Sequence, residues 1–130
     1  MIIDSSALVA VLLAEDDSDR MIAAMVEARE LRISAANWLE TAIKIDGADD
    51  PVLAEEFEAL LAELSVQIVP VTVELAAGAR HAYRRFGKRR HAAKLNFGDC
   101  FAYALAASLR EPLLFKGNDF SQTDIEPALR

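Results

Sequence analysis

Residues 1–13 read Met-Ile-Ile-Asp-Ser-Ser-Ala-Leu-Val-Ala-Val-Leu-Leu, and this stretch predicts a short strand followed directly by a helix. The three apolar residues at the start predict the strand, which ends at Asp4. Ser5 and Ser6 can cap the helix that follows over Ala7–Leu13. A strand joined to a helix in this way is the repeating element of an α/β fold.

The same alternation continues along the rest of the chain. Further short apolar runs predict strands at 31–34, 66–69 and 113–115. Apolar residues at helical spacing predict helices at about 17–29, 35–45, 51–64, 72–86 and 99–109. We therefore predict an α/β fold, a three-layer α/β/α sandwich around a short parallel sheet of about four to five strands, in a single domain over residues 1–130.

Two of these helices have an apolar face that we expect to point inward. In the helix that ends near residue 29, the spacing places Ile22, Met25 and Val26 on that face. In the helix at 72–86, the expected inward residues are Ala76, Ala79, Tyr83 and Phe86.

Composition limits the class of protein. Of the 130 residues, 53% are hydrophobic and 27% are charged, which excludes a disordered chain. No apolar run approaches the ~20 residues of a membrane span, and no basic stretch precedes residues 7–14 as in a signal peptide. The single cysteine, Cys100, cannot form an internal disulfide and lies in an apolar run that favours burial. These features predict a cytoplasmic protein.

The net charge of −7 is unevenly distributed. No acid falls between positions 80 and 94, where seven of the 14 basic residues lie, so this stretch carries +7 and the remainder, with seven basic and 21 acidic residues, carries −14. Such a basic segment could bind a phosphate backbone, and we name Arg80, Arg84, Arg85, Lys88, Arg89 and Arg90 as candidates. A solvated helix end and loop would show the same pattern.

Four acids lie in or beside mostly apolar segments, namely Asp4, Glu40, Asp99 and Asp119. An acid in such surroundings is costly unless another group compensates its charge. Two such charges ~4 Å apart would repel by ~4 kcal/mol at an effective dielectric constant near 20, and a divalent cation would remove that repulsion. Asp4 and Asp119 both follow predicted strands, and ligands of α/β folds bind at the carboxyl ends of strands. The four acids therefore predict a metal-dependent phosphodiesterase site.

Neighbouring polar residues are candidate helpers of this site. Ser6 could orient Asp4 or a bound water, and Asn118 and Asp124 could assist Asp119. Helix or turn capping is the competing interpretation for Asp4, Asp99 and Asp119. Oxygen ligands favour Mg²⁺, with Mn²⁺ as the alternative, over zinc. The chain contains neither a Gly-x-Ser-x-Gly sequence nor a P-loop.

Three segments and one helix residue resemble a known family. They are Ile-Ile-Asp-Ser-Ser-Ala-Leu-Val-Ala at 2–10, Glu40, Asn-Phe-Gly-Asp-Cys-Phe-Ala-Tyr-Ala-Leu-Ala at 96–106, and Pro-Leu-Leu-Phe-Lys-Gly-Asn-Asp-Phe-Ser-Gln-Thr-Asp-Ile at 112–125. Together they are similar to the PIN domain, and in particular to the VapC toxins of bacterial type II toxin–antitoxin systems. The resemblance spans essentially the whole chain.

The resemblance implies a Mg²⁺-dependent endoribonuclease, cleaving transfer RNA or another structured RNA. It also implies inhibition by a cognate VapB-type antitoxin, and a homodimer. It assigns metal-site roles to Asp4, Glu40, Asp99 and Asp119, and matches Ser6 to the small hydroxyl position of the family. An antitoxin would cover apolar helical surface, for which Ala7–Leu13 and the Trp38 region are candidates, although core packing explains both equally well.

Rival functions make different demands on the sequence. Phosphoaccepting receiver domains need adjacent acids after the first strand, and haloacid-dehalogenase-type phosphatases need Asp-x-Asp there, whereas Asp4 is followed by two serines. The non-enzymatic alternative is a metal-stabilised module that binds RNA or a partner without cleavage. It predicts RNA binding that survives neutralisation of the acids.

Overall fold

The computed structural model describes residues 1–130 and contains one four-stranded parallel sheet. Its strands lie in the order β3-β2-β1-β4, with β1 at Ile2–Ile3, β2 at Arg32–Ser34, β3 at Gln67–Val69 and β4 at Leu113–Leu114. The helices are α1 Ser5–Leu12, α2 Ser18–Glu27, α3 Ala35–Asp46, α4 Pro51–Glu63, α5 Val73–Phe86 and α6 Phe97–Leu109, followed by a short 3-10 helix, η1, at Phe120–Gln122. None of these helices has the length and apolar character needed to cross a membrane. The predicted α/β sandwich around a parallel sheet is confirmed.

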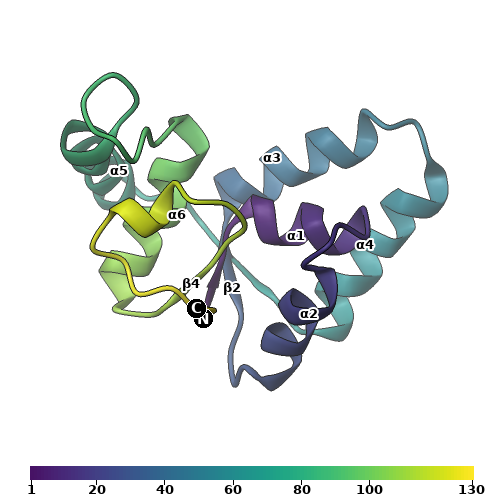
Figure 1. Cartoon of the computed structure of the whole chain (residues 1–130). Coiled ribbons are helices and arrows are strands. Elements are labelled where there is room, and N and C mark those ends of the chain that lie inside the picture. The colour runs from purple at the N-terminus through teal and green to yellow at the C-terminus, as the bar shows by residue number, and fades with distance from the viewer.

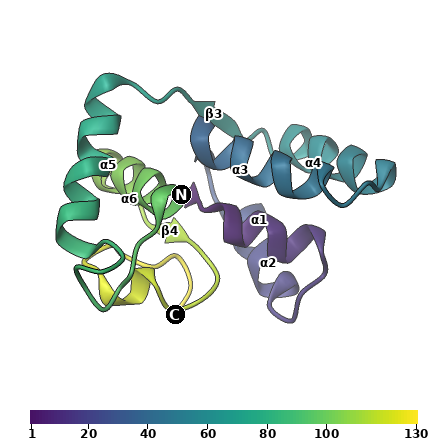
Figure 2. The same cartoon turned by 90° about the horizontal axis from the view of Figure 1, so that it is seen from above.

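Helices cover both faces of the sheet, which therefore separates two apolar cores. Neighbouring residues of a strand point to opposite faces, so Ile2 and Leu113 join the core beneath α5 and α6. Ile3 and Leu114 join the core beneath α1 to α4. Figures 1 and 2 show α5 and α6 together on one side of the strands and α1 to α4 on the other. Burial on both faces explains why β1 and β4 consist of apolar residues alone.

Capping residues set the helix boundaries, in two places differently from the sequence prediction. Helix α1 begins at Ser5 rather than Ala7, because the Asp4 carboxylate, not a serine, accepts the N–H of Ser6 and caps it. Helix α6 begins at Phe97 rather than Asp99, because the Asn96 side chain is its cap. Each of these two helices therefore begins two residues before the predicted start.

The buried face of α2 also differs from the prediction. Met21 and Met25 are buried, whereas Ile22 and Val26 are 38% and 67% exposed. The helix has only ten residues and packs mainly on α1, so a single stripe at four-residue spacing is enough to cover the contact. In α5 the inward residues include Ala79 and Phe86 as expected, but Ala76 and Tyr83 are exposed and Ala82 is buried instead.

The polar side chains of the candidate site gather at the carboxyl end of the central strand β1. Strands β1 and β4 are parallel neighbours, and the backbone N–H of Asp4 donates to the carbonyl of Leu114 at 2.9 Å. The chain leaves β1 toward β2 on one side, while β4 lies on the other, so the carboxyl end of β1 is the point where strand order reverses. Ligands of open α/β sheets bind at such a point.

Candidate active site

The four acids singled out in the sequence line one cavity at this edge of the sheet. The cavity has a volume of about 350 Å³ and is lined by Asp4, Ser5, Ser6, Val9, Glu15, Glu40, Lys44, Asn96, Asp99, Lys116, Asp119 and Phe120. We call it the acid cavity. A larger hollow of about 960 Å³ lies beside Met1 and the α2 helix and includes none of the four acids.

Asp4 is the most buried acid of the chain, with 2% of its surface exposed. Its Oδ2 accepts hydrogen bonds from the backbone N–H of Ser6 at 3.0 Å and from the Ser6 hydroxyl at 2.5 Å. Its Oδ1 is buried without a hydrogen-bond partner. Burial raises the pKa of this carboxyl from an ordinary 3.8 to about 6, although both bonds from Ser6 oppose the rise. An unpartnered buried oxygen of this kind needs a partner that the protein itself does not supply.

Glu40 reaches the cavity from α3 and is oriented by two neighbours. Its Oε1 accepts hydrogen bonds from the Ser5 hydroxyl at 2.5 Å and from the Asn37 amide at 3.3 Å. The Asn37 amide also donates to the carbonyl of Gly98 at 2.9 Å, which joins α3 to the start of α6. A Cβ atom at position 98 would overlap the Glu40 carboxylate. The absence of a side chain at Gly98 therefore creates the space that this carboxylate occupies.

Asp99 lies in the first turn of α6 and forms a capping box with Asn96. The Asn96 side chain accepts the N–H of Asp99 at 2.9 Å, and the Asp99 Oδ2 accepts the N–H of Asn96 at 3.0 Å. Burial, followed by the charges of Asp4, Asp119 and Glu40, raises the pKa of the Asp99 carboxyl to about 7. The Asp99 carboxylate thus caps α6 and also lines the acid cavity, so the two interpretations of this residue are compatible.

Asp119 comes from the segment after β4 and is exposed at the cavity wall. Gly117 turns the chain there with a φ of 101°, a left-handed value that favours glycine. The next residue after Asp119, Phe120, is buried in the core beneath α5 and α6. Asp119 makes no side-chain capping bond to η1, so its carboxylate is available to the cavity.

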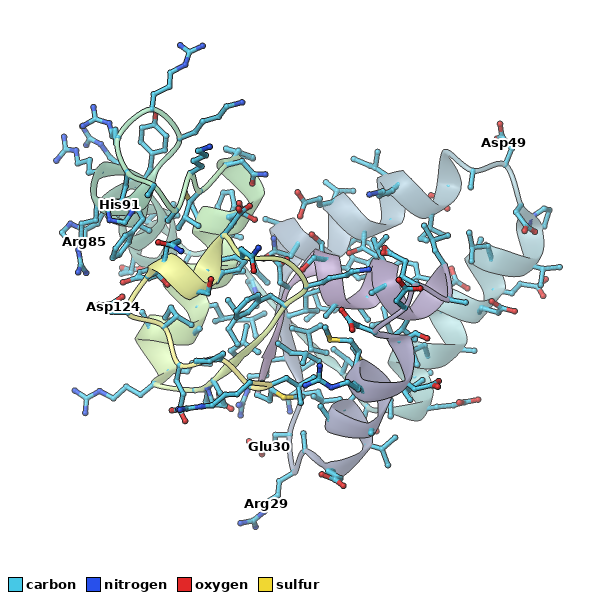
Figure 3. All side chains as sticks on the ribbon, viewed as in Figure 1. Arg29, Glu30, Asp49, Arg85, His91 and Asp124 are labelled. Atoms are coloured by element: carbon cyan, nitrogen blue, oxygen red, sulfur yellow. The ribbon has the colours of Figure 1, made fainter.

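The structure brings Ser6 to the acids but places the other two predicted helpers outside the cavity. Asn118 is exposed, and its carbonyl accepts a hydrogen bond from Ser121. Asp124 accepts a hydrogen bond from the Tyr103 hydroxyl at 2.6 Å and pairs with Arg85 at 3.4 Å. These interactions, with the Tyr103 bond foremost, hold the pKa of Asp124 below its ordinary value. Figure 3 shows Asp124 beside Arg85, on the α5 and α6 side of the molecule.

The donors of the acid cavity fit a hard divalent cation. They are carboxylate oxygens, and one of them, Asp4 Oδ1, is buried and unpartnered. As the side chains stand, however, no three acidic, histidine or cysteine residues converge tightly enough to form a metal cluster. Two of the acids, Asp4 and Asp99, have raised pKa values, mainly because they are buried and to a smaller extent because other carboxylates lie nearby.

The basic segment, residues 80–94, occupies the C-terminal part of α5 and the loop that follows. Its candidate RNA contacts are all exposed, namely Arg80, Arg84, Arg85, Lys88, Arg89 and Arg90. A backbone bridge between Gly87 and Leu95 closes the loop at its base. Nitrogen-tipped side chains gather around α5 in Figure 3, where Arg85 and His91 are labelled.

Cys100, which the sequence predicts to be buried, and His91, in the basic segment, both have structural roles. Cys100 is buried, and burial raises the pKa of its thiol to about 11, so it is protonated at neutral pH and packs as a core residue. His91 accepts the N–H of Ala93 through Nδ1 and packs edge-on against Phe86. Neither has the surroundings of a nucleophile or a metal ligand.

Sequence reasoning missed four polar residues that shape the cavity: Ser5, Asn37, Asn96 and Lys116. A signal existed for two of them. Asn37 lies three residues before Glu40, on the same helix face, and Asn96 lies three residues before Asp99, the spacing of a capping box. No local pattern pointed to Lys116.

Comparison with known proteins shows what the chain as a whole is similar to. A model of the PIN domain matches residues 1–126. Ribonuclease VapC28 of Mycobacterium tuberculosis is 46% identical over 130 residues, which covers 99% of this chain and 98% of that protein. Ribonuclease VapC30 of the same organism is 48% identical over 126 residues, with 96% and 95% covered.

Solved structures show the same fold at much lower identity. The crystal structure of Mycobacterium tuberculosis VapC20, described as a Sarcin-Ricin loop cleaving toxin, aligns with a TM-score of 0.76 at 19% identity and covers 95% of each chain. A toxin–antitoxin complex from Klebsiella pneumoniae aligns with a TM-score of 0.72 at 16% identity, covering 95% of this chain and 92% of that chain. At these identities the likeness shows the fold alone.

Proposed function

The chain belongs to the PIN-domain family, and on that premise we propose that it is a divalent-metal-dependent endoribonuclease, the toxin of a VapBC-type toxin–antitoxin pair. One observation carries the proposal: four acids from four separate segments line one cavity, where the most buried of them has an unpartnered oxygen. Burying carboxylates and placing them close together is energetically unfavourable, and such an arrangement suits metal-assisted hydrolysis of a phosphodiester. The proposal treats residues 1–130 as one PIN domain.

We propose that Asp4, Glu40, Asp99 and Asp119 hold Mg²⁺, with Mn²⁺ as a substitute. When bound, the ion supplies Lewis acidity to the phosphate and makes water a stronger nucleophile. Ser6 fixes one oxygen of Asp4, which leaves Oδ1 free for the ion. Ser5 and Asn37 keep Glu40 turned toward the cavity, and Asn96 does the same for Asp99.

The acid with the fewest hydrogen bonds to the protein, Asp119, is the candidate for proton transfer. Asp119 is exposed and makes no capping bond, so its carboxylate can approach a water on the RNA side of the cavity. We assign it the role of accepting the proton of the attacking water. The water would then attack the phosphorus in line with the departing ribose oxygen, which would take a proton from solvent and leave as a hydroxyl.

The basic segment would hold the RNA backbone outside the cavity. Its exposed arginines and lysines carry positive charge, which suits contacts to phosphates rather than to base edges. The substrate proposed is a structured RNA, such as transfer RNA. The choice among such RNAs would come from shape.

A VapB-type antitoxin and a second copy of the chain are the proposed partners. Of the two surfaces suggested by the sequence, Ala7–Leu13 is buried over residues 7–10 and reaches the surface only at its end, where Leu13 is 47% exposed. Trp38 is half-buried. Helix α3, which carries Glu40, also has two exposed apolar side chains, Leu39 and Ile43, which are 51% and 64% exposed. We propose α3 as part of the surface that a partner covers.

Cleavage of end-labelled total RNA and transfer RNA, with Mg²⁺ or with EDTA, tests the function. Calorimetric titration with Mg²⁺ and Mn²⁺, on the wild type and on Asp4→Asn, tests the site without relying on activity. We expect discrete fragments that EDTA abolishes, and cation binding that Asp4→Asn weakens at least tenfold. If the protein binds RNA without cleaving it, and Asp4→Asn binds RNA equally well, the result would support the non-catalytic module instead.

A further inference from the structure

Positive charge is scarce inside the acid cavity. Five acids line it, namely Asp4, Glu15, Glu40, Asp99 and Asp119, against only two cations, Lys44 and Lys116. An RNA phosphate brings a further negative charge to this place. A cation held in a fixed position beside the acids would therefore act directly on the reacting phosphate.

The backbone of Lys116 is tied to the most buried acid. The N–H of Lys116 donates to the Ser6 hydroxyl oxygen at 3.0 Å, and that hydroxyl donates to Asp4 Oδ2 at 2.5 Å. The N–H of Asp4 in turn donates to the carbonyl of Leu114, two residues before Lys116. Lys116 thus holds a fixed place relative to the Asp4 carboxylate. Lys44, on α3, is exposed and makes neither a hydrogen bond nor an ion pair through its side chain.

The side chain of Lys116 is held less firmly than its backbone. Its Nζ lies 3.1 Å from Glu15 Oε2, and the two side chains are 32% and 33% exposed. Ion pairs this open to solvent contribute little to stability, so exchanging Glu15 for a phosphate oxygen costs little. Glu15 belongs to the turn after α1 and lies 101 residues away in sequence, which makes this contact a purely tertiary one.

We propose that Lys116 is a catalytic residue of the RNA-cleavage reaction proposed above, on which this inference rests. Its ammonium leaves Glu15, binds a non-bridging oxygen of the scissile phosphate and stabilises the charge that develops there during hydrolysis. The ammonium stays protonated throughout and forms no covalent bond. Glu15 keeps the side chain at the cavity between turnovers. Lysine suits this task because its ammonium is a compact point charge on a flexible stem.

Three variants separate catalysis from a merely structural ion pair. Lys116→Met removes the charge and breaks the pair. Glu15→Gln also breaks the pair but keeps the ammonium, and Lys116→Arg keeps a cation. Steady-state cleavage of a defined RNA in saturating Mg²⁺, together with calorimetric Mn²⁺ affinity and the thermal midpoint, is measured for all three and the wild type.

We expect Lys116→Met to lower kcat about 10²–10³-fold with little change in KM or thermal midpoint, and with Mn²⁺ affinity unchanged or higher. Glu15→Gln, which keeps the ammonium, should lower kcat at least tenfold less than Lys116→Met does, and Lys116→Arg should recover at least tenfold over Lys116→Met. Equal losses in Lys116→Met and Glu15→Gln, or a Lys116→Met enzyme within threefold of wild type, would overturn the role of Lys116 while leaving the function intact. Absence of metal-dependent cleavage by the wild type would overturn the function itself, and this role with it.

Discussion

The acid cavity and the basic segment are built in opposite ways. The four acids come from segments up to 115 positions apart, and Asp4, Glu40 and Asp99 are each fixed by hydrogen bonds to neighbouring residues. The basic side chains lie within residues 80–94, all exposed, and of their long side chains only Arg85 makes a hydrogen bond. Rigid placement suits chemistry at one phosphate, whereas loose, exposed cations suit binding to a backbone of variable shape. The comparison predicts large, specific effects in the cavity and small, additive, salt-dependent effects in the segment.

The largest effect should follow from neutralising an acid of the cavity. Asp99→Asn keeps the size of the side chain and can keep the cap on α6, so we expect a loss of activity of at least about 10³-fold with the fold intact. Initial rates of RNA cleavage and the far-UV circular dichroism spectrum measure the two consequences.

Asp124→Asn is the matched control for that variant. Asp124 lies outside the acid cavity and contacts Tyr103 and Arg85. The cleavage rate of Asp124→Asn should therefore stay within about threefold of wild type. A comparable loss in both variants would mean that the distinction between the two aspartates is wrong.

A methyl group at position 98 should damage the site without damaging the fold. Gly98→Ala places a Cβ where the Glu40 carboxylate lies, and only the end of that flexible side chain has to move. Misplacement on the ångström scale costs up to about 10²-fold in rate, so we expect a 10–100-fold drop in kcat. The free energy of unfolding, measured in urea, should change by less than about 1 kcal/mol, because alanine is the better helix former.

Gly78→Ala provides the comparison for Gly98→Ala. Its Cβ would meet only the Ala104 methyl group at an ordinary 3.5 Å, in the middle of α5. Stability should rise by about 0.5–1 kcal/mol and the rate should stay the same. A rate loss here as large as at position 98 would point to a general effect of helix substitution.

Two adjacent arginines should differ in their contribution to RNA binding. Arg84 makes no hydrogen bond or ion pair and is free for phosphate, whereas Arg85 is engaged with Asp124 and lies over the Phe86 ring at 4.6 Å. Arg84→Gln should weaken RNA binding about threefold and lower the slope of log K against log salt by about 1, with kcat unchanged. Arg85→Gln should change binding less and the thermal midpoint more. Fluorescence anisotropy of labelled RNA at several salt concentrations measures the slopes. Equal slopes in the two variants would contradict the assignment of Arg84, rather than Arg85, to a phosphate contact.

The smallest effect concerns stability against pH in the metal-free protein. The folded-state pKa values of Asp4 and Asp99, about 6 and about 7, lie above the ordinary 3.8. Between those values the folded protein binds more protons than the unfolded chain, so stability is greater at low pH and falls as pH rises through about 4 to 7. With allowance for solvent screening, we expect the thermal midpoint in EDTA to fall by roughly 3–10 °C from pH 5 to pH 8.

Asp99→Asn should flatten that pH dependence, because one of the two titrating groups is gone. Saturating Mg²⁺ should restore the wild-type midpoint at pH 8. The pKa values of Glu111 and Asp124 are lowered from ordinary values of 4.5 and 3.8, so these acids should add little to the change between pH 5 and pH 8. A midpoint that rises with pH in EDTA would show that the acids are not destabilised by burial.

Local features of the chain were predictable from sequence because their causes act within a few residues. The parallel strands, the helix at Pro51 with its Asp50 cap and the end of α5 at Gly87 follow from apolar spacing and capping chemistry. The basic segment was visible for the same reason, since contiguous charges need no fold to be recognised. The helix faces were less predictable, because the side of α2 that is buried depends on how α1 packs against it.

The sequence by itself determined the two apolar faces of the sheet, the four candidate acids and the position of the basic segment. Only the tertiary structure decided that Asp119 lines the cavity while Asp124, five residues later, turns to Tyr103, because burial of Phe120 separates the two. It also decided the placement of Ser5, Asn37, Gly98 and Lys116 around the acids. Local propensity fixes which residues begin and end an element, whereas the meeting of side chains from distant segments depends on the packing of whole helices across the sheet.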